Sequence, residues 1–97
     1  MTGHPDPDVE QSVAFVRERQ AAGDEAKPSE NLRALLDTPF GARAWFRVGD
    51  LARIYIVFRG LDVPLADAMT VAGLWDPTDP SAPFSDERLD QLLTRAP

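Results

Sequence analysis

AWFRVGDLARIYIVFR, residues 44–59, is compatible with two different folds. Large apolar side chains in its second half recur at spacings of three and four residues, which is the period of one helical face. The residues on that face are Leu51, Ile54, Tyr55 and Phe58. Gly49 and Asp50 precede them as a stop and a cap, and Gly60 follows them as an end. The spacing predicts a helix whose apolar face belongs to the core.

The same letters also fit a β-hairpin. Residues 54–58 are β-branched or aromatic and apolar on both faces, which is typical of a buried strand. Residues 45–48 would pair with them across a turn at residues 49–50. We favour the helix, because Leu51 and Ala52 extend the helical face and Gly60 closes it. The choice separates an all-α fold from an α+β fold with a hairpin over residues 44–59.

Capping signals predict further short helices on both sides of this stretch. Short polar side chains accept hydrogen bonds from the unpaired N–H groups at a helix start, and Pro has no N–H to lose there. The expected start signals are Asp6 or Asp8, Ser29, Thr38 before Pro39, Asp62 with Pro64, and Ser85. We therefore expect a mostly α bundle of about five short helices. Its expected core is Val13, Val16, Leu35, Leu36, Phe46, Leu51, Ile54, Phe58, Met69, Leu89 and Leu92.

The length of 97 residues suits one domain. Residues 1–8 have few apolar side chains to anchor them, so we expect a flexible N-terminal tail. Residues 9–97 should form a single helical domain. Prolines 77, 80 and 83 prevent a continuous helix, which predicts a proline-rich loop at residues 75–84.

The charge is acidic and unevenly distributed. The formal net charge is −6: residues 1–30 carry −4, residues 31–75 carry +1, and residues 76–97 carry −3. This balance disfavours a protein that coats nucleic acid or an anionic membrane. Because no apolar run approaches the roughly 20 residues of a membrane span, we expect a soluble, cytoplasmic protein with no membrane partner. Nine arginines against one lysine suggest a bacterial or phage genome.

The residues needed for catalysis or for metal and cofactor binding are scarce. The chain has no Cys, and its one His, His4, lies in the expected tail. A histidine-based triad or a multi-histidine metal site therefore cannot be built. The glycines are isolated, so no phosphate-binding loop is present. We expect no enzyme activity, no metal and no cofactor.

The central arginines offer one route to nucleic acid. Arg43 and Arg47 are four residues apart on a predicted helix, and Arg53 lies in the same central region. Folding could gather them into a basic patch for DNA or another anion. The opposing interpretation pairs these arginines with nearby aspartates such as Asp50. DNA binding is therefore the alternative rather than the favoured function.

Aromatic residues favour a protein partner. Trp75 and Phe84 bracket the proline-rich loop, and Trp45 adds a third large ring. Aromatic residues are enriched at the centres of protein interfaces. We therefore expect a small acidic protein-binding regulator or assembly component that binds another protein or itself as a homodimer. A third hypothesis is an acidic inhibitor that occupies the basic groove of a nucleic-acid-handling enzyme.

Overall fold

The computed structural model describes residues 6–22, 27–79 and 84–93. In these residues six α-helices and one π-helical turn follow one another: α1 (Pro7–Ala22), α2 (Pro28–Leu36), α3 (Pro39–Arg43), η1 (Ala44–Val48), α4 (Asp50–Gly60), α5 (Leu65–Leu74) and α6 (Asp86–Leu93). The described residues contain no strand, and their single β-bridge joins Trp75 to Phe84. The predicted small all-α bundle is confirmed. The hairpin over residues 44–59 is wrong.

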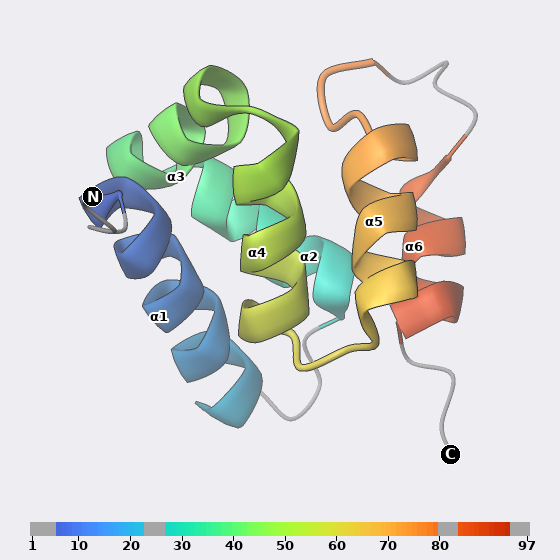
Figure 1. Ribbon diagram of the computed structural model, residues 1–97. Helices are drawn as coiled ribbons and strands as arrows, with labels where there is room; N and C mark the ends of the chain where they lie inside the picture. Colours follow the sequence, from blue (N-terminus) through green and yellow to red (C-terminus); the bar gives the residue numbers. More distant parts are fainter. Residues whose placement is uncertain (1–5, 23–26, 80–83, 94–97) are drawn as a thin grey trace.

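The helices form two layers (Figure 1). In the front layer α4 lies between α1 and α5 and packs against both. α1 and α4 run in the same direction, and α5 runs antiparallel to α4. Behind them α2 contacts α1, α3 and α6. α4 is therefore the central helix of the front layer, with α1 and α5 on its two flanks and η1 beside it.

The core contains the side of α4 opposite to the one predicted. Ala52, Ile56, Val57 and Gly60 of α4 are buried. Leu51 is 82% exposed, although we expected it in the core. The reason is that large apolar residues surround α4 almost completely, so periodicity alone does not select its inner face. Gly60 brings the helix close to α1, where an added Cβ would lie 3.1 Å from Val16.

Other core predictions have mixed outcomes. Val16, Leu35 and Leu89 are fully buried, as expected. The partly buried members of the predicted core are Val13, Leu36, Ile54, Phe58 and Leu92. Phe46 and Met69 are exposed, so placing them in the core was wrong. Trp45, next to Phe46, fills that part of the interior instead.

Three of the predicted helix starts are confirmed by their hydrogen bonds. Asp6 Oδ1 accepts from the backbone N–H of Asp8, and Thr38 Oγ1 accepts from that of Gly41. Ser85 Oγ accepts from the N–H of Arg88. These local side-chain bonds satisfy N–H groups that lack a partner within the helix.

The predicted cap at Asp50 is wrong, because Gly49 takes the N-cap position of α4. α5 begins after Pro64, with no side-chain cap from Asp62.

Ser29 does not cap α2, which already begins at Pro28. Its backbone N–H and its hydroxyl each donate to a carboxylate oxygen of Asp90, at 2.8 Å. The predicted cap is therefore wrong. Its side chain instead fastens α2 to α6, because a carboxylate can accept from both donors at once.

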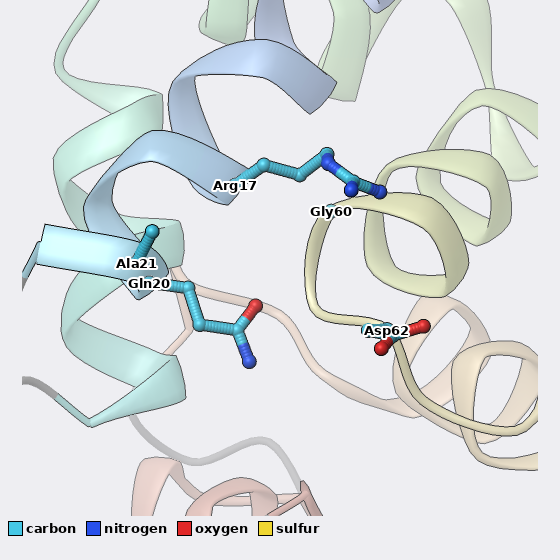
Figure 2. A pocket seen from close by; sticks show the side chains of 5 residues that line it. All are labelled: Arg17, Gln20, Ala21, Gly60 and Asp62. Carbon is cyan, nitrogen blue, oxygen red and sulfur yellow. The ribbon is translucent and has the colours of Figure 1, made fainter.

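Two side chains of α1 hydrogen-bond to the end of α4 and the residue after it. Both line a pocket between α1 and the end of α4, together with Gly60 and Asp62 (Figure 2). Arg17 Nη1 donates to the carbonyl of Arg59 at 3.1 Å, and Gln20 Nε2 donates to that of Leu61 at 3.2 Å. The last carbonyls of a helix lack intrahelical donors and carry partial negative charge. The guanidinium of Arg17 therefore lies beside the C-terminus of α4.

The boundaries of the expected domain differ slightly from those observed. α1 begins at Pro7, so it includes the last two residues of the segment expected as a tail. The rest of that tail, including His4, and residues 80–83 of the proline-rich loop lie outside the described residues. The expected helix from Pro39 widens at Ala44 into the π-turn η1 and ends before Gly49.

Candidate functional site

The three aromatic residues predicted as partner anchors are buried. Trp45 is 1% exposed, Trp75 3% and Phe84 7%. The two indole rings meet edge to face with their centroids 5.5 Å apart, a favourable arrangement for aromatic quadrupoles. Their burial leaves these rings little surface with which to contact a partner directly. Each has an aromatic or cationic neighbour: the two indole rings contact each other, and Arg88 lies over the ring of Phe84.

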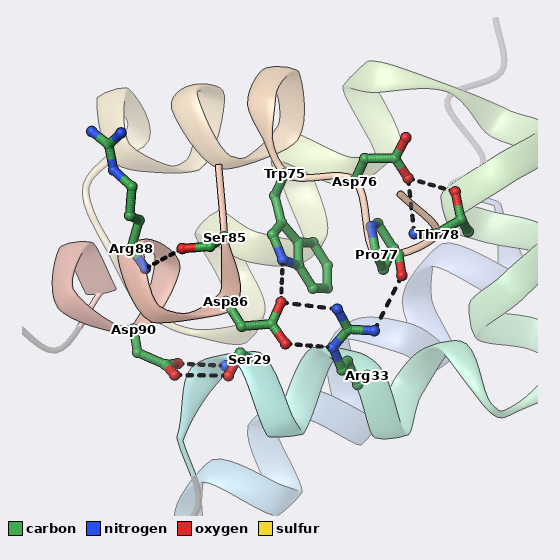
Figure 3. A network of polar contacts seen from close by, with 10 residues as sticks. All are labelled: Ser29, Arg33, Trp75, Asp76, Pro77, Thr78, Ser85, Asp86, Arg88 and Asp90. Carbon is green, nitrogen blue, oxygen red and sulfur yellow. Dashed lines mark hydrogen bonds and ion pairs between the residues drawn. The ribbon is translucent and has the colours of Figure 1, made fainter. Parts of the chain in front are cut away.

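A polar network fixes Trp75 in this position (Figure 3). Its indole N–H donates to Asp86 Oδ1 at 2.8 Å, and Arg33 donates to both oxygens of the same carboxylate at 2.6 and 2.9 Å. Arg33 also binds the carbonyl of Pro77. The hydrogen bonds from Arg33, and after them the one from Trp75, lower the pKa of Asp86 from its ordinary value. The network joins α2, the end of α5 and α6.

The three central arginines do not form a basic patch that is free to bind an anion, because two of them are paired with aspartates. Arg43 donates to both carboxylate oxygens of Asp8, at 2.8 and 3.0 Å. The resulting pair lowers the pKa of Asp8 and raises that of Arg43. Arg53 binds the carbonyl of Trp45 at 2.7 Å and Asp50 at 3.3 Å. Arg47 is exposed and adds to the lowering of the pKa of Asp8.

The structure does bring Trp45, Trp75 and Arg53 together around one hollow of about 270 Å³. Arg53 lies over the Trp45 ring, 5.6 Å from its centroid. In the described part of the chain, no buried side-chain nitrogen or oxygen lacks a hydrogen-bond partner. In this hollow Arg53 is engaged by the carbonyl of Trp45, and Asp76 accepts from Thr78.

The outer side of α4 and α5, by contrast, exposes large apolar side chains to solvent. On α4, Leu51 and Tyr55 are exposed, and Ile54 and Phe58 beside them are partly exposed. On α5, Leu65 and Met69 are exposed one helical turn apart. α4 and α5 pack against each other, so these exposed apolar residues lie on two neighbouring helices. We call these six residues the α4–α5 face.

A groove extends this face toward α1. Val13 and Ala14 of α1 and Tyr55 of α4 supply its apolar lining. Glu10 and Arg17, also on α1, supply its charges. The exposed side of α4 therefore adjoins an apolar flank of α1, which Glu10 and Arg17 border.

Sequence reasoning identified the side chains of this face but assigned them to the core. A helix with large apolar residues on every side is the signal that could have shown the outer face, because a surface helix usually carries polar residues there. Of the described residues, no group of three or more His, Cys, Asp or Glu is placed to hold a metal ion. No helix in those segments has the length and apolar character required to cross a membrane.

The surface that stands out is therefore apolar and lies on the exposed sides of α4 and α5, with Glu10 and Arg17 of α1 at one edge. The exposed fractions of its residues identify this surface, as do the buried residues on the other sides of α4 and α5. Comparison of the chain with protein-family models, with curated proteins and with solved structures finds no match.

Proposed function

We propose that this chain is a small, acidic, non-enzymatic regulator or assembly component that works by binding a protein partner through the α4–α5 face. The proposal includes a cytoplasmic location and a bacterial or phage origin, in keeping with the arginine-rich composition. One observation carries the binding function: Leu51 of α4 is 82% exposed. It lies on the same side of the helix as Ile54, Tyr55 and Phe58, which are also large, apolar and at least partly exposed.

An isolated exposed leucine is ordinary, but a contiguous apolar surface is not. Leu51, Ile54, Tyr55 and Phe58 occupy consecutive turns of one helix side, and Met69 lies on the adjacent helix. Each square ångström of such surface costs about 25 cal/mol while it faces water. A partner that covers it recovers this free energy, which favours binding.

The same geometry favours protein over DNA as the partner. Arg43 and Arg53, two of the three arginines considered for DNA, already pair with Asp8 and Asp50. A DNA-binding surface needs basic side chains directed at phosphates. The α4–α5 face offers apolar side chains instead, which match the buried centre of a protein interface.

The test is an affinity capture from host lysate with two tagged variants beside the unaltered chain. Leu51→Glu places a charge at the most exposed point of the face, and Glu18→Arg alters charge on α1 outside it. We expect one or more proteins to be recovered in stoichiometric amounts by the unaltered chain and by Glu18→Arg. Recovery should survive nuclease and be lost with Leu51→Glu. Equal recovery by all three chains would contradict the proposed function.

A further inference from the structure

We propose that residues 84–93, which include α6, form a latch that opens as one unit while the rest of the bundle stays folded. We call these residues the α6 segment. When it is closed, it covers part of α2 and α5. When it opens, it uncovers that surface together with donor groups of Ser29, Arg33 and Trp75. This inference goes beyond the proposed function and does not depend on the α4–α5 face.

The α6 segment lies at one edge of the bundle, beside α5 (Figure 1). It packs against α2 and α5. The contacts of α1 with α2, α3 and α4, and those of α4 with α5, hold the other helices together without it. Among the described residues, all but two of the buried apolar side chains lie outside the segment, the exceptions being Phe84 and Leu89. Opening the segment therefore leaves most of the core in place.

Two aspartates of α6 fasten the closed segment (Figure 3). Asp86 accepts from Arg33 at 2.6 and 2.9 Å and from the indole N–H of Trp75 at 2.8 Å. Asp90 accepts from the backbone N–H and the hydroxyl of Ser29, each at 2.8 Å. The two aspartates are four residues apart, so they lie one turn apart on the same side of the helix. The polar attachment is thus concentrated on one side of α6.

This attachment can be exchanged for water at a modest cost. The side chains of Arg33 and Asp86 are 47% and 39% exposed, so both already contact solvent. Ion pairs with this much exposure contribute little to stability. The apolar attachment of α6 is also small, because Leu89 is its one buried residue and Leu92 and Leu93 are only partly buried. Opening the segment therefore costs less than unfolding the bundle.

The segment should open as a unit and not residue by residue from its end. α6 has eight residues, or about two turns. A helix of fewer than about 12 residues is not stable by itself in water. Leu89 lies between the two aspartates in sequence, so the apolar and polar attachments alternate along the helix. Once they are released, the helix has nothing to sustain it, and the segment is lost together.

Native-state hydrogen exchange of the unaltered chain measures this opening. NMR follows single amides under conditions in which the opening equilibrium sets the exchange rate. We expect Leu89, Leu92 and Leu93 to share one protection factor, at least about tenfold below that of Ile56 and Val57 in α4. Dilute urea should accelerate exchange less in α6 than in α4, because opening the segment exposes less surface than unfolding the bundle.

Two results of this measurement would overturn the inference. Equal protection in α6 and α4 would mean that α6 opens only when the whole bundle unfolds. A gradual loss of protection from Leu89 to Leu93, with Leu89 as protected as Ile56, would mean that the helix only frays at its end.

A substitution in α4 separates the two kinds of opening. Ile56→Val removes one methyl group from the core around α4, whose packing persists when the α6 segment opens. It should accelerate exchange in α4 about twofold to tenfold and leave exchange in α6 unchanged. Equal acceleration of both sets of amides would show that they exchange through the same unfolding, which overturns the inference.

A substitution in α6 tests the attachment itself. Asp90→Asn destabilises the closed state relative to both the open and the unfolded states, so it should accelerate exchange in α6 and α4 by the same factor, about fivefold to tenfold. Glu87→Gln is the matched control, because it removes one negative charge from an exposed position of the same helix. It should change either rate by no more than about twofold. If Asp90→Asn has no more effect than Glu87→Gln, the carboxylate of Asp90 does not hold the segment closed, and the latch is overturned.

Discussion

Trp75 donates its indole N–H to Asp86 Oδ1 at 2.8 Å, and this bond joins the end of α5 to the start of α6. Arg33 of α2 binds both oxygens of the same carboxylate. One side chain thus connects α2 with the end of α5 and the start of α6. Removal of the Asp86 carboxylate should destabilise the fold more than the loss of an ordinary exposed ion pair would. The reason is that the buried indole N–H of Trp75 also loses its acceptor.

Asp86→Asn tests this connection. The substitution keeps the shape but removes the charge and replaces an acceptor oxygen by an NH₂ group. We expect the free energy of unfolding to fall by about 1–2 kcal/mol, a figure reduced for the partial exposure of the pair. Urea denaturation measures it. Glu87→Gln, one residue further along and exposed, should change stability by less than about 0.5 kcal/mol. Equal effects of the two substitutions would show that the network contributes nothing.

Acid should weaken the same connection. The hydrogen bonds from Arg33 lower the pKa of Asp86 below its ordinary 3.8. A carboxyl whose pKa is lower in the folded chain stabilises the fold above its unfolded pKa, and this contribution disappears as pH falls through the folded pKa. The free energy of unfolding should therefore decline as pH falls from about 5 to below 3.8.

Two other carboxyls act in the same direction. The pKa of Asp8 is lowered by its hydrogen bonds with Arg43, and that of Asp76 by hydrogen bonds from Thr78. The acid-dependent decline should thus become shallower in Asp86→Asn without disappearing. Urea titrations of both chains at a series of pH values measure the two slopes. Identical slopes would contradict the assignment of this stability to Asp86.

Opposite sides of α4 should respond differently to truncation. Ile56 is fully buried and Leu51 is 82% exposed. Ile56→Ala should cost about 2–5 kcal/mol, because it removes buried methyl groups and leaves a cavity. Leu51→Ala should change monomer stability by no more than about 0.5 kcal/mol. Both are measured by urea denaturation at concentrations where the chain is monomeric. A larger cost for Leu51→Ala would mean that the predicted core face was right and the observed one wrong.

The features of this chain that its sequence predicts correctly are those decided by residues close together in the chain. Helix type and several helix starts were correct, because a cap such as Thr38 and the N–H that it accepts from at Gly41 lie within one turn. The inner face of α4 was not predictable in this way. Leu51 and Phe58 are larger than Ala52 and Gly60, so hydrophobicity alone places them inside. The close approach of Gly60 to Val16 on another helix decides the opposite orientation.

The candidate site was missed for a related reason. Trp75 appeared suited to an exposed anchor beside prolines, yet its burial depends on Arg33 and Asp86, which are 53 residues apart in the chain. Likewise Arg43 is neutralised by Asp8 across 35 residues. No spacing rule along the sequence reports such pairs. The chemistry of the α4–α5 face was visible in the sequence, but its exposure required the fold.

Gly41 and Gly73 differ in the space around them. A Cβ added at Gly41 would overlap the backbone carbonyl of Leu35, whereas one added at Gly73 meets nothing within 4 Å. The Leu35 carbonyl also accepts the hydroxyl and the N–H of Thr38, so it cannot move without breaking the turn between α2 and α3. Gly41→Ala should therefore lower the free energy of unfolding by about 3 kcal/mol or more.

Gly73→Ala is the matched control, because it adds the same methyl group to an exposed helical position. It should stabilise the chain by about 0.4–1 kcal/mol through a smaller conformational entropy of the unfolded state. Thermal and urea denaturation of the two variants measure both effects. If Gly41→Ala were as stable as Gly73→Ala, α3 would have to pack against α2 with more space than the Leu35 carbonyl allows, and the tight α2–α3 turn described above would be wrong.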